Sequence, residues 1–381
     1  MLDSLTIELQ NKLKSVDDSI WTEFFIDHPD STSMINLMQD SGTNPVEFKS
    51  LVIKSRNKPA VILPLFITKY SLLTTVIPEM NGKIKDFAIH LNKHFPQWFQ
   101  VKVLGIGFVE GEYGEIGLDK NLNIENADYT SLWDEIIKTL KSLQKNLKLD
   151  VIAFKDFTAI TKKQLPKSIT NNYICANSLP FCVLDINFKT LDEYLKSISH
   201  EMKRYLNHSI KKSSPIEVMI TNSPKTNDLD TIYSLYNIQV ESAELSFGKH
   251  NQAYFDNICK TVSGAQYVLF YLDSRLIGFD LIVTNKNVLV QKYIAFDKEV
   301  GRKYNLYFRA FIEKIKICLA HNLTQLYLGA SLEETKYKLG CHLIPSYIYF
   351  QHKNPIINYY LQKFKKHIEY VSAITIEDNV I

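Results

Sequence analysis

The chain has 381 residues, more than one ordinary core accommodates, and this length suits two domains of about 150–200 residues each. Its formal net charge of +3 is too small to indicate a nucleic-acid partner by itself. The five cysteines are widely spaced and form no CxxC pair, which argues against a disulfide framework and against a zinc site.

The first residues, MLDSLTIELQNKLK, show no basic segment followed by an uninterrupted apolar stretch, as a signal peptide would. No run of about 18 apolar residues, the length of a transmembrane helix, occurs in the sequence. From these two observations we expect a cytoplasmic protein without a transmembrane segment.

The first half begins with two runs rich in β-branched residues, 48–55 and 60–70, which flank a polar turn and predict a β-hairpin. A third strand is predicted over 101–110. An amphipathic helix follows, because apolar residues recur at three- and four-residue steps over 132–143. A short apolar strand, 149–154, comes next. The predicted order is therefore hairpin, strand, helix, strand.

The second half repeats this order without repeating the residues. A hairpin is predicted over 265–284, a strand over 288–296, an amphipathic helix over 307–319 and a short strand over 324–329. A strand, a helix and a strand in succession normally place the two strands parallel, with a right-handed crossover. The sequence therefore predicts an α/β protein (α+β in class) of two related halves, each a mixed, mostly antiparallel sheet flanked by helices.

The expected join between the halves is the polar loop around 158–178, which contains Pro166. This places one domain at 1–165 and the other at 166–381. Chemistry is expected in the second domain, and the first is expected to be a degenerate copy.

A basic amphipathic helix is predicted over 191–212. Thr190 and Glu193 have the spacing of a capping box, and an apolar stripe follows them. The cationic face is either simply solvated or receives phosphates of a tRNA, of coenzyme A or of an anionic lipid headgroup. That face carries Lys196, His200, Lys203, Arg204, His208, Lys211 and Lys212.

Several standard catalytic motifs are absent from the sequence. It contains no GxSxG, no GxxxxGK[ST], no HExxH and no GxGxxG that opens a helix after a strand. The ten histidines show no metal-ligand spacing, so no metal is expected. These absences argue against serine hydrolases, P-loop NTPases, zinc proteases and dinucleotide-binding enzymes of the usual kinds.

The junction between the strand at 288–296 and the helix expected to begin near Tyr304 is a candidate anion site. Backbone N–H groups at such a junction attract an anion, Gly301 lets a phosphate approach, and Arg302 and Lys303 add positive charge. The alternative is a plain loop with a helix-entry glycine, and the local sequence favours that alternative because one glycine is a weak motif.

The order of elements resembles the fold of the Gcn5-related N-acetyltransferases (GNAT). The stretch YLGASLEETKYKLGCHLIPSYIYFQHKNP also resembles the C-terminal part of acetyltransferase-like proteins related to FemAB peptidyltransferases and to peptidoglycan biosynthesis/recognition proteins. This resemblance covers residues 180–360, and reaches the first half only through element order. Its positions are Gly329, Ala330, Ser331, Glu334, Lys336, Gly340, Pro345, His352 and Asn354.

The resemblance implies tandem GNAT-like domains and transfer of an acyl group to a small-molecule or peptide amine. Many GNAT enzymes bind the coenzyme A pyrophosphate with a (Q/R)xxGx(G/A) loop, whereas the string at 298–303, KEVGRK, keeps one glycine and ends in lysine. FemAB relatives, whose donor is aminoacyl-tRNA, lack a good version of this loop. The donor is therefore left open between acyl-CoA, an acyl carrier protein and aminoacyl-tRNA.

The resemblance also implies roles for residues. In this fold a backbone N–H of the strand at 288–296 holds the acyl carbonyl; on a regular strand Lys292 and Tyr293 point to opposite faces, so only one can face the site. Donor contacts are implied at Gly301, Arg302, Lys303, Tyr304, Asn305 and Ile294, catalytic groups at Tyr293, Tyr304 and Glu334, and substrate-binding contacts at Lys292, Glu241, Lys249 and Arg204, of which Glu241 and Lys249 would contact the acceptor.

Each of these assignments has an alternative. Glu334 is as readily a solvated charge in a polar turn, and Glu241 and Lys249 fit a surface turn that ends at Gly248. The protein as a whole is interpreted as an acyl- or aminoacyl-transferase. A non-catalytic GNAT-like module that binds a glycan, a peptide or a protein, and a tRNA- or nucleic-acid-binding protein that uses the helix at 191–212, are the alternatives.

Overall fold

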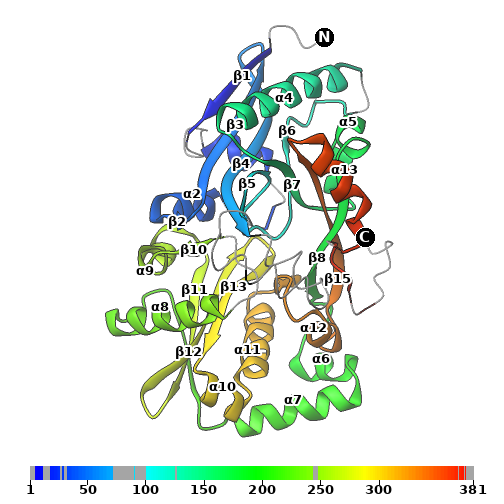
Figure 1. The fold of residues 1–381 in the computed structure, drawn as a ribbon. Helices are drawn as coiled ribbons and strands as arrows, with labels where there is room; N and C mark the ends of the chain where they lie inside the picture. Colours follow the sequence, from blue (N-terminus) through cyan, green and yellow to red (C-terminus); the bar gives the residue numbers. More distant parts are fainter. Residues whose placement is uncertain are drawn as a thin grey trace.

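The structure is a computed structural model, and its elements are labelled in Figure 1. Within the residues that it describes, no helix has the length and apolar character needed to cross a membrane. It describes residues 5–11, 18–25, 28–29, 32–71, 90, 100–124, 127–242, 248–367, 369–372 and 374.

Both predicted hairpins are present. In the first, β3 and β4 pair antiparallel around Arg56 and Asn57, whose φ angles of 50° and 64° suit a tight two-residue turn. In the second, β11 and β12 pair around Asp273 and Ser274, with φ angles of 50° and 63°. The elements of the first half are β1 (Leu5–Gln10), α1 (Asp18–Phe24), α2 (Thr32–Ser41), β2 (Thr43–Asn44), β3 (Glu47–Ser55), β4 (Lys58–Ser71), β5 (Gln100–Ile106), β6 (Gly117–Leu118), α4 (Ala127–Asn146), β7 (Val151–Thr158), the 3₁₀ helix η3 (Thr161–Gln164) and α5 (Lys167–Thr170).

The second half repeats the hairpin, strand, helix and strand in β11 to β14. The helix expected to begin near Tyr304 is divided into two, α10 and α11, which meet at Asn305 with a left-handed φ of 53°. The elements are β8 (Ile174–Asp185), α6 (Leu191–Ser197), α7 (His200–Lys212), β9 (Glu217–Thr221), α8 (Thr226–Glu241), β10 (Lys249–His250), α9 (Gln252–Thr261), β11 (Ala265–Leu272), β12 (Arg275–Asn285), β13 (Val288–Phe296), α10 (Lys298–Tyr304), α11 (Leu306–Ala320), β14 (Gln325–Tyr327), α12 (Glu333–Lys338), β15 (His342–His352), α13 (Pro355–Lys363) and the 3₁₀ helix η4 (Lys365–His367).

One sheet runs through both halves. Its strand order is β1-β3-β4-β5-β7-β15-β8-β14-β13-β12-β11-β9, with β6 beside β4. The crossovers behave as predicted, because β5 pairs parallel with β7 and β13 pairs parallel with β14. β15, from the end of the chain, lies between β7 and β8 and pairs antiparallel with both. The last strand therefore joins the halves, and the proposed boundary at 165/166 falls in the connection between β7 and β8.

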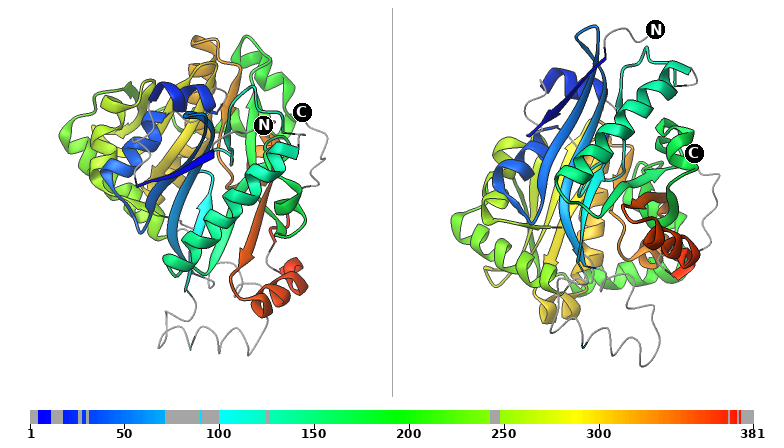
Figure 2. Two further views of the ribbon diagram at one scale, coloured as in Figure 1. Left: turned by 90° about the horizontal axis from the view of Figure 1, so that it is seen from above. Right: turned by 45° about the horizontal axis from the view of Figure 1, so that its top comes forward.

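Helices cover the two faces of this sheet. On one face a single apolar core spans both halves: α2 packs against α9, and buried side chains of β3 and β4 join those of β11 and β12. On the other face α4 covers the first half and α11 covers the second, each over its own core. Figures 1 and 2 show α2, α9 and α8 along the same side of the molecule. The face that α2, α8 and α9 cover is where polar groups of the two halves meet.

Candidate active site

The loop after β5 carries the first group of the site. The strand predicted over 101–110 ends at Ile106, because Gly107 turns the backbone away with a φ of 110°. Gly105 lets the chain pass under Phe66, since a Cβ atom there would lie 2.0 Å from the Phe66 ring. Glu110 and Glu112 follow in the loop, which brings two carboxylates of the first half to the edge of β13.

Glu110, His250 and Tyr293 form a polar cluster between the halves. The Tyr293 hydroxyl donates to a Glu110 carboxylate oxygen, and His250 Nε2 lies 2.9 Å from that oxygen and 2.6 Å from the Tyr293 hydroxyl. The Tyr254 ring stacks on His250 with centroids 4.0 Å apart and planes at 7°. His250 is fully buried, whereas the Glu110 side chain stays 25% exposed. Glu110 is therefore the member of the cluster that a substrate can reach.

A two-stranded ribbon of β2 and β10 holds His250 in place. His250 pairs with Thr43 across it, and the Thr43 hydroxyl lies 2.9 Å from His250 Nδ1. Because that hydroxyl donates its own proton to the Met38 carbonyl, it can only accept from Nδ1–H. Nδ1 therefore carries a proton, and Nε2 is the nitrogen that faces Glu110 and Tyr293.

A β-bulge at Lys292 changes the faces of β13. Gln291 pairs with Ile282 and Tyr293 with Leu281, so Lys292 is an extra residue on this strand. The expectation that only one of Lys292 and Tyr293 can face the site is wrong, because it assumed a regular strand. Tyr293 reaches Glu110, and Lys292 Nζ lies 3.3 Å from Glu112, with both side chains of this ion pair nearly buried.

Burial and charge set the ionisation of the cluster. Burial raises the pKa of Glu110, but the charge and hydrogen bond of His250, the hydrogen bond of Tyr293 and the charge of Lys292 outweigh it, so the pKa lies below its usual 4.5. Burial, followed by the negative charge of Glu110, raises the pKa of Tyr293 well above 10. At neutral pH an ionised carboxylate thus accepts a hydrogen bond from a neutral phenol.

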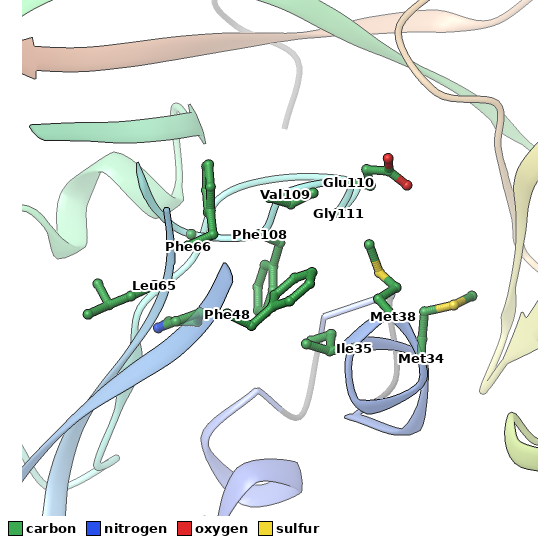
Figure 3. A pocket seen from close by; sticks show the side chains of 12 residues that line it. Met34, Ile35, Met38, Phe48, Leu65, Phe66, Phe108, Val109, Glu110 and Gly111 are labelled. Carbon is green, nitrogen blue, oxygen red and sulfur yellow. The ribbon is translucent and has the colours of Figure 1, made fainter. Parts of the chain in front are cut away.

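An apolar pocket lies beside Glu110 in the first half (Figure 3). It is lined by α2, β3, β4 and the loop after β5, with Phe48, Phe66 and Phe108 opposite Met34 and Met38. Its volume is about 20 Å³, which is room for a water molecule and not for an acyl chain. The pocket has one carboxylate at its rim, that of Glu110.

Beyond Val290, β13 and β14 separate. β13 pairs with β14 only through Val288–Val290, while β14 stays hydrogen-bonded to β8 as far as Gly329. A Cβ atom at Gly329 would have no atom within 4 Å, so the strand end borders open space. Among the described residues, the edge of β13 around the bulge has no neighbouring strand.

Lys336 lies buried at the end of β14. Its Nζ donates to the carbonyl oxygens of Leu328, at 2.5 Å, and Gly329, at 3.2 Å. Burial lowers its pKa, and the negative charge of Glu112 opposes that effect. Lys336, Glu112 and Lys292 therefore form a chain of buried charges between the opening and the loop after β5.

The predicted donor loop at 298–303 is not a loop. These residues form α10, and the Asp297 carboxylate caps its first N–H groups by accepting from Glu299 and Val300. The backbone N–H groups that were expected to bind a phosphate at this helix start are thus already hydrogen-bonded to Asp297. Gly301 lies inside the helix, where a Cβ atom would approach Phe296 to 3.0 Å, so its role is close packing.

The remaining donor residues lie around the α10–α11 junction, beside α7. Arg302 and Lys303 are exposed, Tyr304 is half-buried, and Asn305 donates to Ser209 of α7. Tyr205 of α7 also packs on α11. The basic helix predicted over 191–212 is therefore α6 and α7, separated at Ile198 and Ser199, and α7 stands next to the junction with Arg204 exposed. The Ile294 side chain packs in the core that faces α11.

The other predicted site residues lie apart from the cluster. Glu334 is on the exposed side of α12 and forms an ion pair with Lys338 at 2.7 Å, which fits the alternative of a solvated charge. Glu241 and Lys249 are 3.2 Å from each other at the surface. Among the described residues no group of histidine, cysteine, aspartate and glutamate is arranged to hold a metal.

Sequence reasoning missed four groups of the site: Glu110, Glu112, His250 and Lys336. Glu110 and Glu112 lie in the half expected to be degenerate, and they follow a strand without any motif. His250 stands beside Lys249, which was selected in its place, and Lys336 is among the positions of the family resemblance. Of these four groups, only Lys336 could have been found from the sequence, through the family resemblance at its position.

Comparison with known proteins gives no match at the level of sequence: no family model and no curated protein matches. The structure resembles FemX, with a TM-score of 0.56 and 11% identity over 93% of this chain and 100% of that one. It resembles the C-terminal domain of a putative lysylphosphatidylglycerol synthetase from Agrobacterium fabrum, with a TM-score of 0.52 and 10% identity over 91% of this chain and 96% of that one. It also resembles a tandem GNAT protein from the clavulanic acid biosynthesis pathway, with a TM-score of 0.51 and 9% identity over 92% of this chain and 99% of that one. As the sequence predicts, the protein has the fold that FemX and the tandem GNAT protein share.

Proposed function

We propose that the protein transfers an acyl or aminoacyl group to an amine, at the meeting point of its two halves. The observation that carries this proposal is the Glu110–His250–Tyr293 cluster, because it places an ionised, partly exposed carboxylate beside the bulged strand β13. An amine acceptor needs such a group to orient its nitrogen. The first half thus supplies a reacting group as well as bracing the sheet.

Glu110 binds the acceptor nitrogen and removes a proton after attack. Its lowered pKa makes it a weak base toward a free ammonium group. Once the neutral amine attacks the acyl carbon, however, its nitrogen becomes positively charged and far more acidic, so a carboxylate suffices as acceptor. The N–C bond forms, the C–S or C–O bond of the donor breaks, and the leaving thiol or hydroxyl takes up a proton.

The opening between β13 and β14 is the proposed place of the acyl carbonyl. The unpaired edge of β13 offers backbone N–H groups near Tyr293 and Ile294, which would stabilise the negative charge on the carbonyl oxygen during attack. Lys336 fixes the carbonyl groups that end β14 and adds positive charge nearby. Lys292 remains a proposed acceptor-side group through its pairing with Glu112.

The donor is proposed to bind along α7 and the α10–α11 junction. Arg204, Arg302 and Lys303 are exposed there and would contact donor phosphates. Acyl-CoA, the phosphopantetheine group of an acyl carrier protein and aminoacyl-tRNA all carry such phosphates, so this surface is compatible with each. Because Asp297 caps α10, these contacts come from side chains instead of from the helix start.

Native mass spectrometry with acetyl-CoA, a long-chain acyl-CoA and charged tRNA, each added separately, tests donor binding. We expect one donor class to be retained, and Arg302→Glu to abolish retention while Lys260→Glu, an exposed control on α9, does not. If no donor is retained, the transferase proposal fails and the fold is a recognition module. Retention of uncharged tRNA as strongly as charged tRNA would favour a nucleic-acid-binding protein.

Acceptor recognition is tested with Glu110→Gln, in the presence of whichever donor binds. Glutamine keeps the size of the side chain but loses its charge, so kcat/KM should fall by roughly 10²-fold or more, with a rise in KM for the amine. Glu334→Gln, which neutralises an exposed carboxylate, is the matched control and should leave the rate unchanged. An unaltered rate in Glu110→Gln would remove Glu110 from the mechanism.

A further inference from the structure

α13 turns its apolar side toward solvent. Asn354 caps it by accepting from the N–H groups of Ile356 and Ile357, and Pro355 occupies the first turn. Tyr360 lies on the same side as Ile356, one turn further along, and the two side chains are 53% and 67% exposed. The other exposed apolar side chains of this segment are Ile357, Tyr359 and Phe364.

The inward side of α13 carries Asn358 and Leu361, which are the two partly buried residues of this helix. Asn358 accepts a hydrogen bond from the backbone N–H of His352 in β15, which attaches the helix to the sheet. A surface helix normally directs its apolar stripe to the core. Here two isoleucines and three aromatic rings are exposed in addition to the inward Leu361, and an exposed apolar surface of this kind marks a place that another body covers.

The charged side chains in and next to α13, apart from histidine, are all lysines. Residues 353–368 contain four lysines and neither aspartate nor glutamate. Lys353 is paired with Asp150, and Lys365 lies 3.7 Å from Glu369. Among the described residues, no acidic group lies within ion-pair distance of Lys363 or Lys366. The covering body is therefore expected to be anionic.

The shape of this segment favours a flat partner. The left view of Figure 2 shows α13, in red, projecting from the edge of the fold. Tyrosine and phenylalanine rings with flanking lysines are the combination that settles at a membrane–water interface. A second copy of the chain is disfavoured, since a two-fold contact would place Lys363 and Lys366 against the same lysines.

We infer that α13 and the following turn, residues 355–366, dock the protein on an anionic lipid surface. Ile356, Tyr360 and Phe364 enter the interface between headgroups and acyl chains, and Lys363 and Lys366 contact the lipid phosphates. This inference is independent of the proposed transferase activity, because it rests on no residue of the Glu110 cluster.

Co-sedimentation with vesicles tests the inference. The wild-type protein should bind vesicles of equal parts phosphatidylcholine and phosphatidylglycerol, bind pure phosphatidylcholine vesicles more weakly, and dissociate as salt is added. Ile356→Glu/Tyr360→Glu should lower the partition coefficient at least about tenfold, since it places two carboxylates in the interface. Ile238→Glu changes an isoleucine of similar exposure on α8 and should bind like wild type.

Three outcomes would overturn the inference. One is failure of the wild-type protein to bind phosphatidylglycerol vesicles, and another is undiminished binding by the double variant. The third is a wild-type dimer, measured by light scattering, that the double variant converts to a monomer, because the face would then be an interface between copies. Amine transfer measured without vesicles should be equal in all variants, which separates this test from that of the activity.

Discussion

Glu110 and His250 are 140 positions apart, and each satisfies a need of the other. A carboxylate that is largely removed from water requires hydrogen-bond partners, and Glu110 finds them in Tyr293 and His250. A buried imidazole requires partners at both nitrogens, and Thr43 supplies the second. These mutual requirements make the cluster a structural link between the halves as well as the proposed site of transfer.

The lowered pKa of Glu110 predicts a pH-dependent contribution to stability. A carboxyl group whose folded pKa lies below its unfolded value of about 4.5 stabilises the fold above pH 4.5, and loses that effect as the pH falls through the folded pKa. Urea unfolding of wild type and Glu110→Gln from pH 7 downward should thus give a difference that is constant near neutrality and shrinks below about pH 4.5. A difference that grows on acidification would contradict the assignment.

The Lys292–Glu112 pair predicts strong coupling between two buried charges. Lys292→Met leaves the Glu112 carboxylate without this cation and should lower the free energy of unfolding by roughly 3 kcal/mol. Adding Glu112→Gln should recover much of the loss, because the charge that Lys292 compensated is then gone. Lys338→Met breaks an exposed pair instead and should leave the free energy of unfolding nearly unchanged. Additive losses in the double variant would show that the two side chains are not coupled.

At the scale of elements, close packing of β4 on β5 depends on one missing side chain. Gly105 lies under the Phe66 ring, where a Cβ atom would sit 2.0 Å away. Gly105→Ala should destabilise the protein by about 1–3 kcal/mol in denaturant unfolding, since the ring or the strand must move. Phe66→Leu should lessen the effect of Gly105→Ala, because it removes the ring. An equal cost in both backgrounds would place the strain elsewhere.

The elements predicted from local pattern are largely present. Two-residue turns and three- or four-residue periodicity depend on neighbours in the chain, so both hairpins and both long helices were predictable. The bulge at Lys292 and the division of the helix at Asn305 were not, because each depends on contacts with distant segments. The same holds for Glu110, whose partner Tyr293 is 183 positions away.

At the scale of the whole molecule, the shared sheet predicts one cooperative unfolding transition. All three tryptophans, Trp21, Trp98 and Trp133, lie in the first half, whereas Cys318 and Cys341 are buried in the second. Tryptophan fluorescence and the reactivity of these two thiols should therefore change at the same denaturant concentration. Separate midpoints would show that the halves unfold independently, in spite of β15.

The position of β15 also bears on synthesis of the chain at the ribosome. β7 is complete at residue 158, yet the strand that covers its free edge begins at residue 342 and ends at 352. For about half of translation the first half therefore exposes an unpaired strand edge, the kind of surface on which other chains aggregate. The first half can finish folding only after nearly the whole chain has been synthesised.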